Sequence, residues 1–227
     1  MAKLTNQVIG RLSGTVGNIV FRQRNGKTFA SSRPASFYPG FDEASVGRRD
    51  RFGIACKFSS RIYAQPYLKK IWKDYLPSGK APYNYITKIN YQYTGAGNLT
   101  DLAVIVPDSG FNININFSTL SPSGMKVIID KIGIDSGIDP YKETFFRLCT
   151  IICLTDPGKA NMNQVEFIVL ISEKKSAVLD SQFTFEHCFS SKEIDLFNTY
   201  NKRKAFSAII TLDADENPVH YSKTFSG

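Results

Sequence analysis

Hydrophobic and polar residues alternate in the stretch NIVFRQRNGKTFAS, on both sides of Asn25-Gly26. Ile19 and Phe21 share one face of the first run, whereas Arg22 and Arg24 share the other. A period of two is typical of a strand with one face toward a core. Asn-Gly between two such runs indicates a tight turn, because that turn needs positive φ at both central residues. The sequence therefore predicts a hairpin with one largely basic face.

The period changes to that of a helix from about Asp42. Apolar or small residues then recur at i, i+3, i+4 and i+7, which is typical of an amphipathic helix. These residues are Phe52, Ala55, Cys56, Ser59, Ile62 and Tyr63. Pro66 suits the first position of a second, short helix, where a missing N–H costs nothing. The residues of that helix predicted to point inward are Leu68, Ile71, Trp72 and Tyr75.

Beyond the linker LPSGKAPYN the pattern becomes that of short strands separated by polar turns. Regular spacing of such strands favours an antiparallel sandwich or barrel. The expected strands are ITKINYQYT, LAVIVP, FNININFSTL, GMKVIIDKI, ETFFRLCTIICLT, NQVEFIVLISE, SQFTFEHCF, KAFSAIITLD and PVHYSKTFS. Residues 192–200 are expected to form one or two helical turns. In FNININF the alternating asparagines indicate a solvated sheet face, and a ligand-facing row is the alternative.

Together these patterns predict a mainly β fold, α+β overall. An N-terminal β-hairpin and amphipathic helices would precede an antiparallel β-sandwich or barrel. Two regions are expected, a basic hairpin-plus-helix region at residues 1–80 and an antiparallel β domain at residues 81–227. The 17 Phe and 11 Tyr residues agree with this fold class, since their side chains suit half-buried strands.

Charge divides the chain at the same place. Residues 1–80 carry 15 basic and four acidic residues, a net charge of +11, while residues 81–227 carry a net charge of −3. An asymmetry of this size indicates an anionic partner for the first region: nucleic acid, an acidic protein surface or a membrane surface. A solvated basic surface without a specific partner is the alternative.

Candidate catalytic and metal-binding residues are sparse. The four cysteines include no CxxC pair, and His187 and His220 lie far apart in the sequence, so we expect no zinc site. Cys149 and Cys153 are expected to be buried free thiols on one face of a strand. The sequence also lacks a phosphate-binding loop, a nucleophile elbow and an EF-hand loop. We therefore expect no catalytic residue, metal or cofactor.

Membrane and export signals are also lacking in the sequence pattern. No apolar run approaches the roughly 18–20 residues that a membrane-spanning helix needs, and the N-terminal segment MAKLTNQVIGRLSG lacks the apolar core of a signal peptide. The sequence therefore predicts a protein of the cytoplasm or of a virion, without a signal peptide and without a membrane span.

Arginine dominates the basic region and supplies the candidate binding site. Its guanidinium offers paired donors to phosphate or carboxylate, whereas lysine acts as a point charge. The residues expected to bind an anionic partner are Arg22, Arg24, Lys27, Arg33, Arg48, Arg49 and Arg51. Nearby aromatic residues such as Phe37 and Tyr38 fit single-stranded nucleic acid, and they fit an acidic neighbouring protein equally well.

The segment GRLSGTVGNIVFRQRNGKTFASSRP, followed by RRDRFGIACKFSSRI, resembles a set of uncharacterised proteins found in Bacteroidota and in phage-like gene neighbourhoods. Those proteins combine a Gly-rich start, a basic hairpin closing on Arg-Pro, an Arg-rich helix and a variable β region. The resemblance covers roughly the first 75 residues and implies no catalytic activity and no site residues. By association it favours a component of a virion or of another assembly.

The sequence thus favours a non-enzymatic structural or interaction protein of a larger assembly, for example a virion. It would dock through its basic N-terminal region onto other protein subunits, with a homo-oligomer as a further option. A nucleic-acid-binding protein that uses the arginine cluster is one alternative. A ligand- or glycan-binding β module is another, although no residue pattern supports it.

Overall fold

The chain forms two compact units, Met1–Val46 and Gly47–Gly227, in the computed structural model. The structure describes residues 2–3, 12–24, 26–33, 36, 38, 40–133, 136–159 and 161–227. Phe37 and Asn25 lie outside these ranges.

The described residues of the first unit form a four-stranded antiparallel sheet. Its strands are β1 (Ala2–Lys3), β2 (Gly14–Val16), β3 (Ile19–Arg24) and β4 (Lys27–Ser32), in the order β1-β4-β3-β2. The predicted hairpin is confirmed, because β3 pairs with β4 from Ile19 opposite Ser32 to Arg24 opposite Lys27. Gly26 in the turn has a φ of 73°, the conformation that favours glycine at this position.

The described part of the chain contains four helices, three between β4 and β5 and one between β10 and β11. They are α1 (Glu43–Ala64), α2 (Pro66–Tyr75), α3 (Pro82–Gln92) and α4 (Ser191–Thr199). Pro66 and Pro82 each occupy a first helical position, where the proline ring fixes φ and no N–H is needed. At the start of α4, Ser190 and Glu193 form a capping box. None of these helices is long and apolar enough to cross a membrane.

The buried faces of α1 and α2 differ in part from the predicted ones. Ala55, Ser59 and Ile62 of α1 are buried as expected, together with Ile54 and Phe58. The predicted inward residue Phe52 is 56% exposed, and its ring meets the Tyr91 ring edge-on with ring centres 6.4 Å apart. In α2 the prediction was wrong for Tyr75, which is 45% exposed. Each helix packs through a narrow stripe, so residues at the stripe's margin face solvent.

The described residues of the second unit form two antiparallel sheets. The strands are β5 (Ile115–Ser121), β6 (Gly124–Ile129), β7 (Phe145–Pro157), β8 (Val165–Ile171), β9 (Lys175–Ser176), β10 (Phe183–Cys188), β11 (Tyr200–Leu212), β12 (Pro218–Tyr221) and β13 (Phe225–Ser226). A three-stranded sheet has the order β10-β6-β5. A six-stranded sheet has the order β12-β11-β7-β8, with β13 also on β11 and β9 also on β7. The predicted mainly β, α+β fold class is confirmed.

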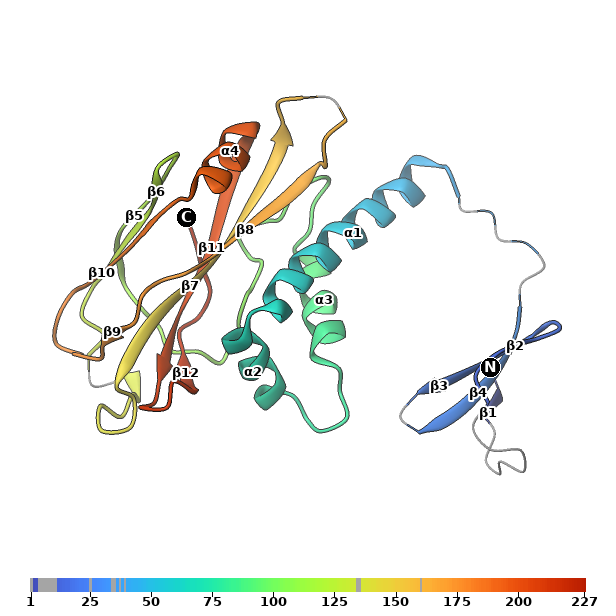
Figure 1. Cartoon of the computed structure of the whole chain (residues 1–227), viewed down its shortest axis with the longest axis horizontal. Coiled ribbons are helices and arrows are strands. Elements are labelled where there is room, and N and C mark those ends of the chain that lie inside the picture. The colour runs from blue at the N-terminus through green and yellow to red at the C-terminus, as the bar shows by residue number, and fades with distance from the viewer. Residues whose placement is uncertain are drawn as a thin grey trace. The chain divides into compact units, whose positions relative to one another are not determined.

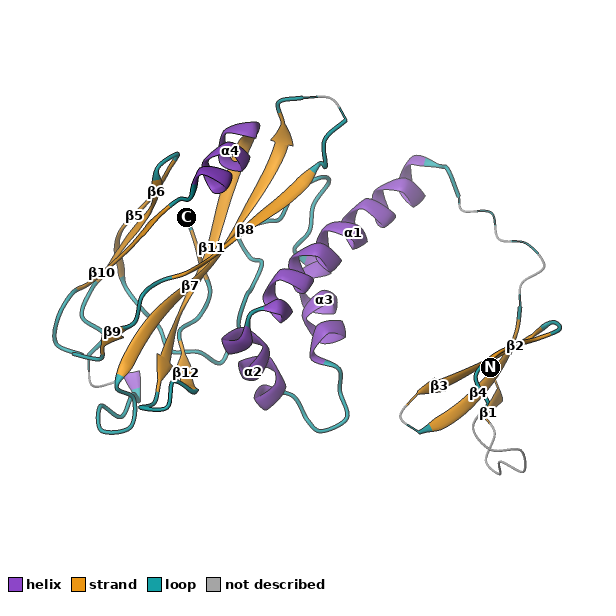
Figure 2. Ribbon diagram, in the orientation of Figure 1, coloured by secondary structure: helices purple, strands orange, loops and turns teal. Residues whose placement is uncertain are grey.

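The six-stranded sheet is the middle of three layers (Figures 1 and 2). One of its faces packs against α1, α2 and α3, and the other packs against the three-stranded sheet. Side chains of β7 alternate between these contacts: Cys149 and Ile151 face the helices, whereas Phe146 and Ile152 face the second sheet. Burial of both faces explains why the central part of β7 and the second half of β11, from Ala205 to Leu212, are mostly apolar without polar alternation.

Two predicted strands are not strands in the structure. The segment ITKINYQYT lies mostly in α3, where Ile86 and Asn90 are buried at a helical spacing. The segment LAVIVP begins in a turn, bends at Ile105 and Val106, and pairs with no strand of the described chain. In FNININFSTL, pairing begins only at Ile115, and Phe111 makes a single isolated bridge to Ser222.

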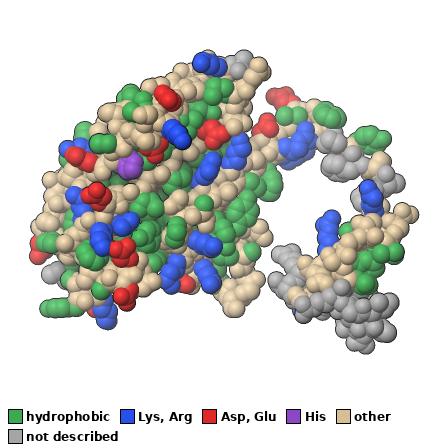
Figure 3. Space-filling view, viewed as in Figure 1, with side chains coloured by type: hydrophobic (Ala, Val, Ile, Leu, Met, Phe, Trp, Pro, Cys, Tyr) green, Lys and Arg blue, Asp and Glu red, His purple; other side chains and the backbone are tan. Residues whose placement is uncertain are grey.

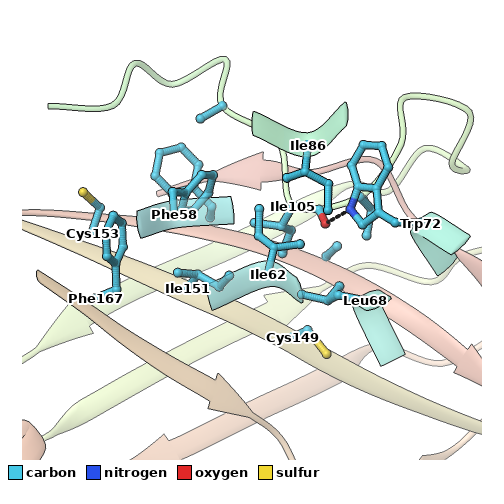
Figure 4. Packing of buried hydrophobic residues seen from close by; sticks show 14 of the residues in the cluster. Phe58, Ile62, Leu68, Trp72, Ile86, Ile105, Cys149, Ile151, Cys153 and Phe167 are labelled. Atoms are coloured by element: carbon cyan, nitrogen blue, oxygen red, sulfur yellow. Dashed lines mark hydrogen bonds between the residues drawn. The ribbon is translucent and has the colours of Figure 1, made fainter. Parts of the chain in front are cut away.

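Side chains, instead of a strand, satisfy the backbone of LAVIVP. The Asn90 side chain donates to the carbonyl oxygen of Val104 at 3.0 Å and accepts from its N–H at 2.9 Å. The Trp72 indole N–H donates to the carbonyl oxygen of Ile105 at 2.8 Å (Figure 4). The Thr224 hydroxyl accepts from the N–H of Ile105 at 3.0 Å. These bonds hold the segment in the core between the helices and the sheet, because buried backbone groups must be paired.

Candidate functional site

Four of the residues predicted to bind an anionic partner lie in the first unit. Arg22 and Lys27 are exposed on β3 and β4, and Arg24 stands opposite Lys27 in the hairpin register. Arg33 follows β4, and its backbone N–H donates to the carbonyl oxygen of Asn18 at 2.7 Å. The other three predicted residues lie on α1 in the second unit, so the predicted set is divided between the two units.

On α1, Arg51 has an internal role. Its Nε donates to the carbonyl oxygen of Thr94 at 2.8 Å, and its Nη2 donates to that of Tyr91 at 3.4 Å. The guanidinium also lies 4.9 Å from the centre of the Tyr91 ring. A cation at the carbonyl end of α3 stabilises that helix terminus, where the backbone dipoles leave a partial negative charge. Arg51 therefore joins α1 to α3, while Arg48 and Arg49 are exposed.

A groove runs between α1 and the start of β8. One hollow of 490 Å³ is lined by Arg49, Asp50, Gly53, Ile54, Lys57, Gly97, Gln164 and Val165. An adjoining hollow of 420 Å³ is lined by Lys57, Ser60, Arg61, Asn163, Glu166 and Phe167. Lys57 lines both hollows, and we call the two together the α1–β8 groove. Lys and Arg side chains gather along α1 and over α2 in Figure 3.

The helical wall of the α1–β8 groove carries three basic residues and one acidic residue, Asp50, and it has one gap. Arg49, Gly53, Lys57 and Arg61 follow each other at four-residue intervals, so they share one side of α1. Gly53 stands inside a helix, where glycine costs about 1 kcal/mol relative to alanine. No atom lies within 4 Å of the position that a Cβ would take at Gly53. The missing side chain therefore leaves open space between two cations.

The charges in the groove differ in how far they are neutralised. Glu166 accepts from the Asn163 side chain at 2.6 Å and lies 3.9 Å from the Arg61 guanidinium. Burial, and then the negative charge of Glu166, raise the pKa of Tyr200, whose hydroxyl donates to the carbonyl oxygen of Asn163. Lys57 makes no ion pair or hydrogen bond with any residue that the structure describes. Its charge therefore remains available to a ligand.

Sequence reasoning missed the groove itself, although it identified Arg49 as a binding residue. Lys57 and Arg61 were not among the residues predicted to bind a partner. Val165, on the opposite wall, is far from them in the sequence and has no charge or functional group. A glycine inside an otherwise strong helical pattern, at Gly53, was the one local signal that could have pointed to this surface.

The cysteines differ from one another in exposure. Cys149 and Cys153 are buried on the same face of β7, as predicted, while Cys56 is half-buried and Cys188 is exposed. Burial raises the pKa of both Cys149 and Cys153 to about 12, so these thiols are protonated at neutral pH. Within the ranges that the structure covers, no three His, Cys, Asp or Glu side chains are grouped to hold a metal ion.

A buried carboxylate contacts a histidine elsewhere in the second unit. Oε1 of Glu143 lies 2.9 Å from Nδ1 of His220 and accepts from the backbone N–H of Asp139 at 2.8 Å. His220 borders a hollow of 370 Å³ that also contains Ser109 and Ser136. Both serine hydroxyls make hydrogen bonds elsewhere, to Tyr221 and to the carbonyl oxygen of Gly133. The contact between Glu143 and His220 links the loop before β7 to β12. The sequence did not predict this contact.

Comparison with known proteins gives little further information. No protein-family model and no curated protein matches this chain. Among solved structures, the third fibronectin III domain of the human KIAA0343 protein matches with 7% sequence identity. The match covers 53% of this chain and 84% of that domain, with a TM-score of 0.27. A likeness this weak carries no argument about function.

Proposed function

We propose that this protein is a non-enzymatic structural or interaction component of a larger assembly, such as a virion. It docks onto other protein subunits through its basic N-terminal region. The observation that carries the proposal is the poor burial of the N-terminal sheet, considered together with its charge.

The N-terminal sheet buries very little of its own surface. Of the residues described between 12 and 46, Thr28 alone is fully buried. Val16 is 69% exposed and Ile19 is 47% exposed, and the two stand opposite each other on β2 and β3. A small sheet whose described residues bury so little apolar surface is marginally stable in water. Contact with a partner would bury these apolar residues and stabilise the sheet.

The charge of the same region indicates what kind of surface the partner has. Residues 1–46 carry six basic and two acidic residues, a net charge of +4, and Arg22, Lys27 and Arg33 are exposed on or beside the N-terminal sheet. An acidic protein surface with an apolar centre would complement this combination of arginine and exposed aliphatic side chains. Docking through these residues is the role that fits them best.

A pull-down from the native source tests this proposal. Full-length protein would be compared with an Arg22→Glu, Arg33→Glu double variant and with a matched Lys131→Glu, Lys192→Glu variant, which makes the same charge change on exposed sites of the second unit. We expect the first variant to lose its partner subunits and the second to keep them. Light scattering and imaging of native particles complete the test. A wild-type protein that is strictly monomeric and absent from every particle contradicts the proposal.

Binding to nucleic acid would be recognised by its salt dependence. Counterion release makes the affinity for an oligonucleotide fall steeply with salt concentration. A steep dependence that disappears in the Arg22→Glu, Arg33→Glu variant, without any loss of protein partners, would replace the docking proposal by a nucleic-acid-binding one.

A further inference from the structure

The outer edge of β8 is open. β8 is the last strand in the order β12-β11-β7-β8, and no strand in the described part of the chain pairs with its far side. Its register against β7 is continuous from Thr155 opposite Val165 to Cys149 opposite Ile171. The sequence VEFIVLI has no proline, no lysine and no bulge, which are usual devices that protect a strand edge, and Glu166 is its only charged residue.

The register shows which backbone groups of β8 point outward. The backbone N–H of Ser172 donates to the carbonyl oxygen of Leu148, so even-numbered residues of β8 bond to β7. On the other side of the sheet, the N–H of Ser222 donates to the carbonyl oxygen of Ile209. Odd-numbered residues of β11 therefore bond to β12 and even-numbered residues bond to β7. Across β7, the even-numbered residues then bond to β8, which agrees with the bond of Ser172. The N–H and C=O groups of the odd-numbered residues Val165, Phe167, Val169 and Ile171 therefore point away from the sheet.

The α1–β8 groove places basic side chains beside this open edge. Phe58 of α1 contacts Phe167 of β8 with ring centres 5.6 Å apart, which fixes the helix beside the strand. Lys57 lies next to Phe58 in the helix and lines both hollows of the groove. Gly53, one turn earlier, leaves room for a chain to approach α1 closely.

We propose that the α1–β8 groove binds an extended acidic segment of a partner protein, which adds a strand to the edge of β8. Backbone hydrogen bonds to the outward groups of β8 supply affinity, as in other cases of strand addition. Every second side chain of the added strand points to the face of the sheet that α1 covers. Carboxylates at those positions reach Lys57 and its neighbours Arg49 and Arg61, which provide the specificity.

This interaction goes beyond the proposed function because it uses a different surface. The α1–β8 groove belongs to the second unit, whereas docking of the N-terminal sheet depends on residues of the first. Substitutions at Arg22 and Arg33 leave the groove unchanged, so each proposal can fail without the other.

Binding of a synthetic peptide to the full-length protein tests the groove. The probe is a fluorescein-labelled octapeptide of alternating glutamate and valine, and the control peptide alternates lysine and valine. We expect Lys57→Glu to weaken binding of the acidic probe by about tenfold or more, since a reversed charge repels it. Lys73→Glu makes the same charge change on the exposed surface of α2, outside the groove, and should change affinity by less than about twofold.

A proline substitution separates strand addition from simple charge attraction. The outward N–H of Val169 makes no bond to β7, so Val169→Pro is compatible with the edge of the sheet but removes one donor from the groove. We expect about a tenfold loss of affinity for Val169→Pro and less than about threefold for Val169→Ala, which keeps the N–H. Far-UV circular dichroism and a thermal transition verify that each variant folds.

Hydrogen exchange of the wild-type protein makes the test independent of those variants. The acidic probe should slow exchange at the amides of Phe167 and Val169, which have no intramolecular acceptor in the register described above. The inference is overturned if these amides are not protected at saturating probe. It is also overturned if Lys57→Glu weakens binding while Val169→Pro, correctly folded, does not, because the groove then attracts anions, nucleic acid included, without adding a strand.

Discussion

Trp72 of α2 donates its indole N–H to the carbonyl oxygen of Ile105, and both residues are completely buried. Ile105 belongs to a segment that pairs with no strand of the described chain, so this bond replaces one that a strand would supply. The indole also contacts the rings of Tyr75 and Tyr85. One side chain thus fills the core and satisfies a backbone group at the same time.

Trp72→Phe should destabilise the protein by about 2–4 kcal/mol. The substitution removes the donor and leaves the Ile105 carbonyl buried without a partner, and it also creates a small cavity. Urea unfolding followed by circular dichroism measures the change. Tyr75→Phe, on the exposed side of the same helix, is the control and should cost less than about 0.5 kcal/mol. Equal stability of the two variants would contradict the role given to Trp72.

Asn90→Leu should cost about 3 kcal/mol or more. The side chain of Asn90 satisfies both the N–H and the carbonyl of Val104, and a leucine of similar size leaves both groups buried and unpaired. Asn84→Leu, at an exposed position of the same helix, is the matched control with an expected change below about 0.5 kcal/mol. The difference between the midpoints of chemical unfolding gives the result, and a similar loss for both substitutions would refute the explanation.

Arg51→Lys should lower the free energy of unfolding by about 1 kcal/mol, although the charge is kept. Lysine cannot reproduce the two hydrogen bonds to the end of α3 or the planar contact with the Tyr91 ring. Lys57→Arg on the same helix should leave stability within about 0.5 kcal/mol of the wild type. Thermal unfolding of the two variants compares them directly. The prediction fails if both substitutions are neutral.

The buried thiols of Cys149 and Cys153 should make the protein less stable in alkali. Burial raises their pKa from an ordinary 9.0 to about 12, so only the unfolded chain releases these protons between those values. Stability is therefore fully retained below pH 9 and is lost as pH rises toward 12, by up to about 1.4 kcal/mol per pH unit and thiol.

Comparison with a Cys149→Ala, Cys153→Ala variant isolates this effect from other groups that titrate in alkali. The difference in unfolding free energy between wild type and variant should stay constant from pH 7 to 9 and then change in favour of the variant. Thiol labelling at neutral pH gives a second measurement, since exposed Cys188 should react quickly and the two buried thiols only on unfolding. A constant difference up to pH 11 would disprove the assignment.

The sequence was most informative where local patterns decide the structure. The Asn25-Gly26 turn predicted the pairing of β3 with β4, and Pro66 marked the start of α2 correctly. The pattern misled where tertiary contacts decide. Apolar LAVIVP has the composition of a strand, but Asn90 and Trp72 bind its backbone from helices that the sequence does not place beside it.

The candidate site shows the same limit. Charge identified α1 as a basic surface, and Arg49 does line the α1–β8 groove. The pattern could not show that Arg51 turns toward α3, because its acceptors are backbone carbonyl groups that every residue has. Nor could it show that Val165 and Lys57 form opposite walls of one groove, because β8 meets α1 only after the six-stranded sheet has formed.

That sheet also determines when the protein can fold during its synthesis. β7 exposes apolar side chains on both faces, and β11, its longest pairing partner, comes much later in the chain. Both apolar faces of β7 therefore remain exposed to other chains until residues through Leu212 have left the ribosome. Cells that make this protein quickly should depend on chaperones during that interval, and fragments ending before β11 should aggregate.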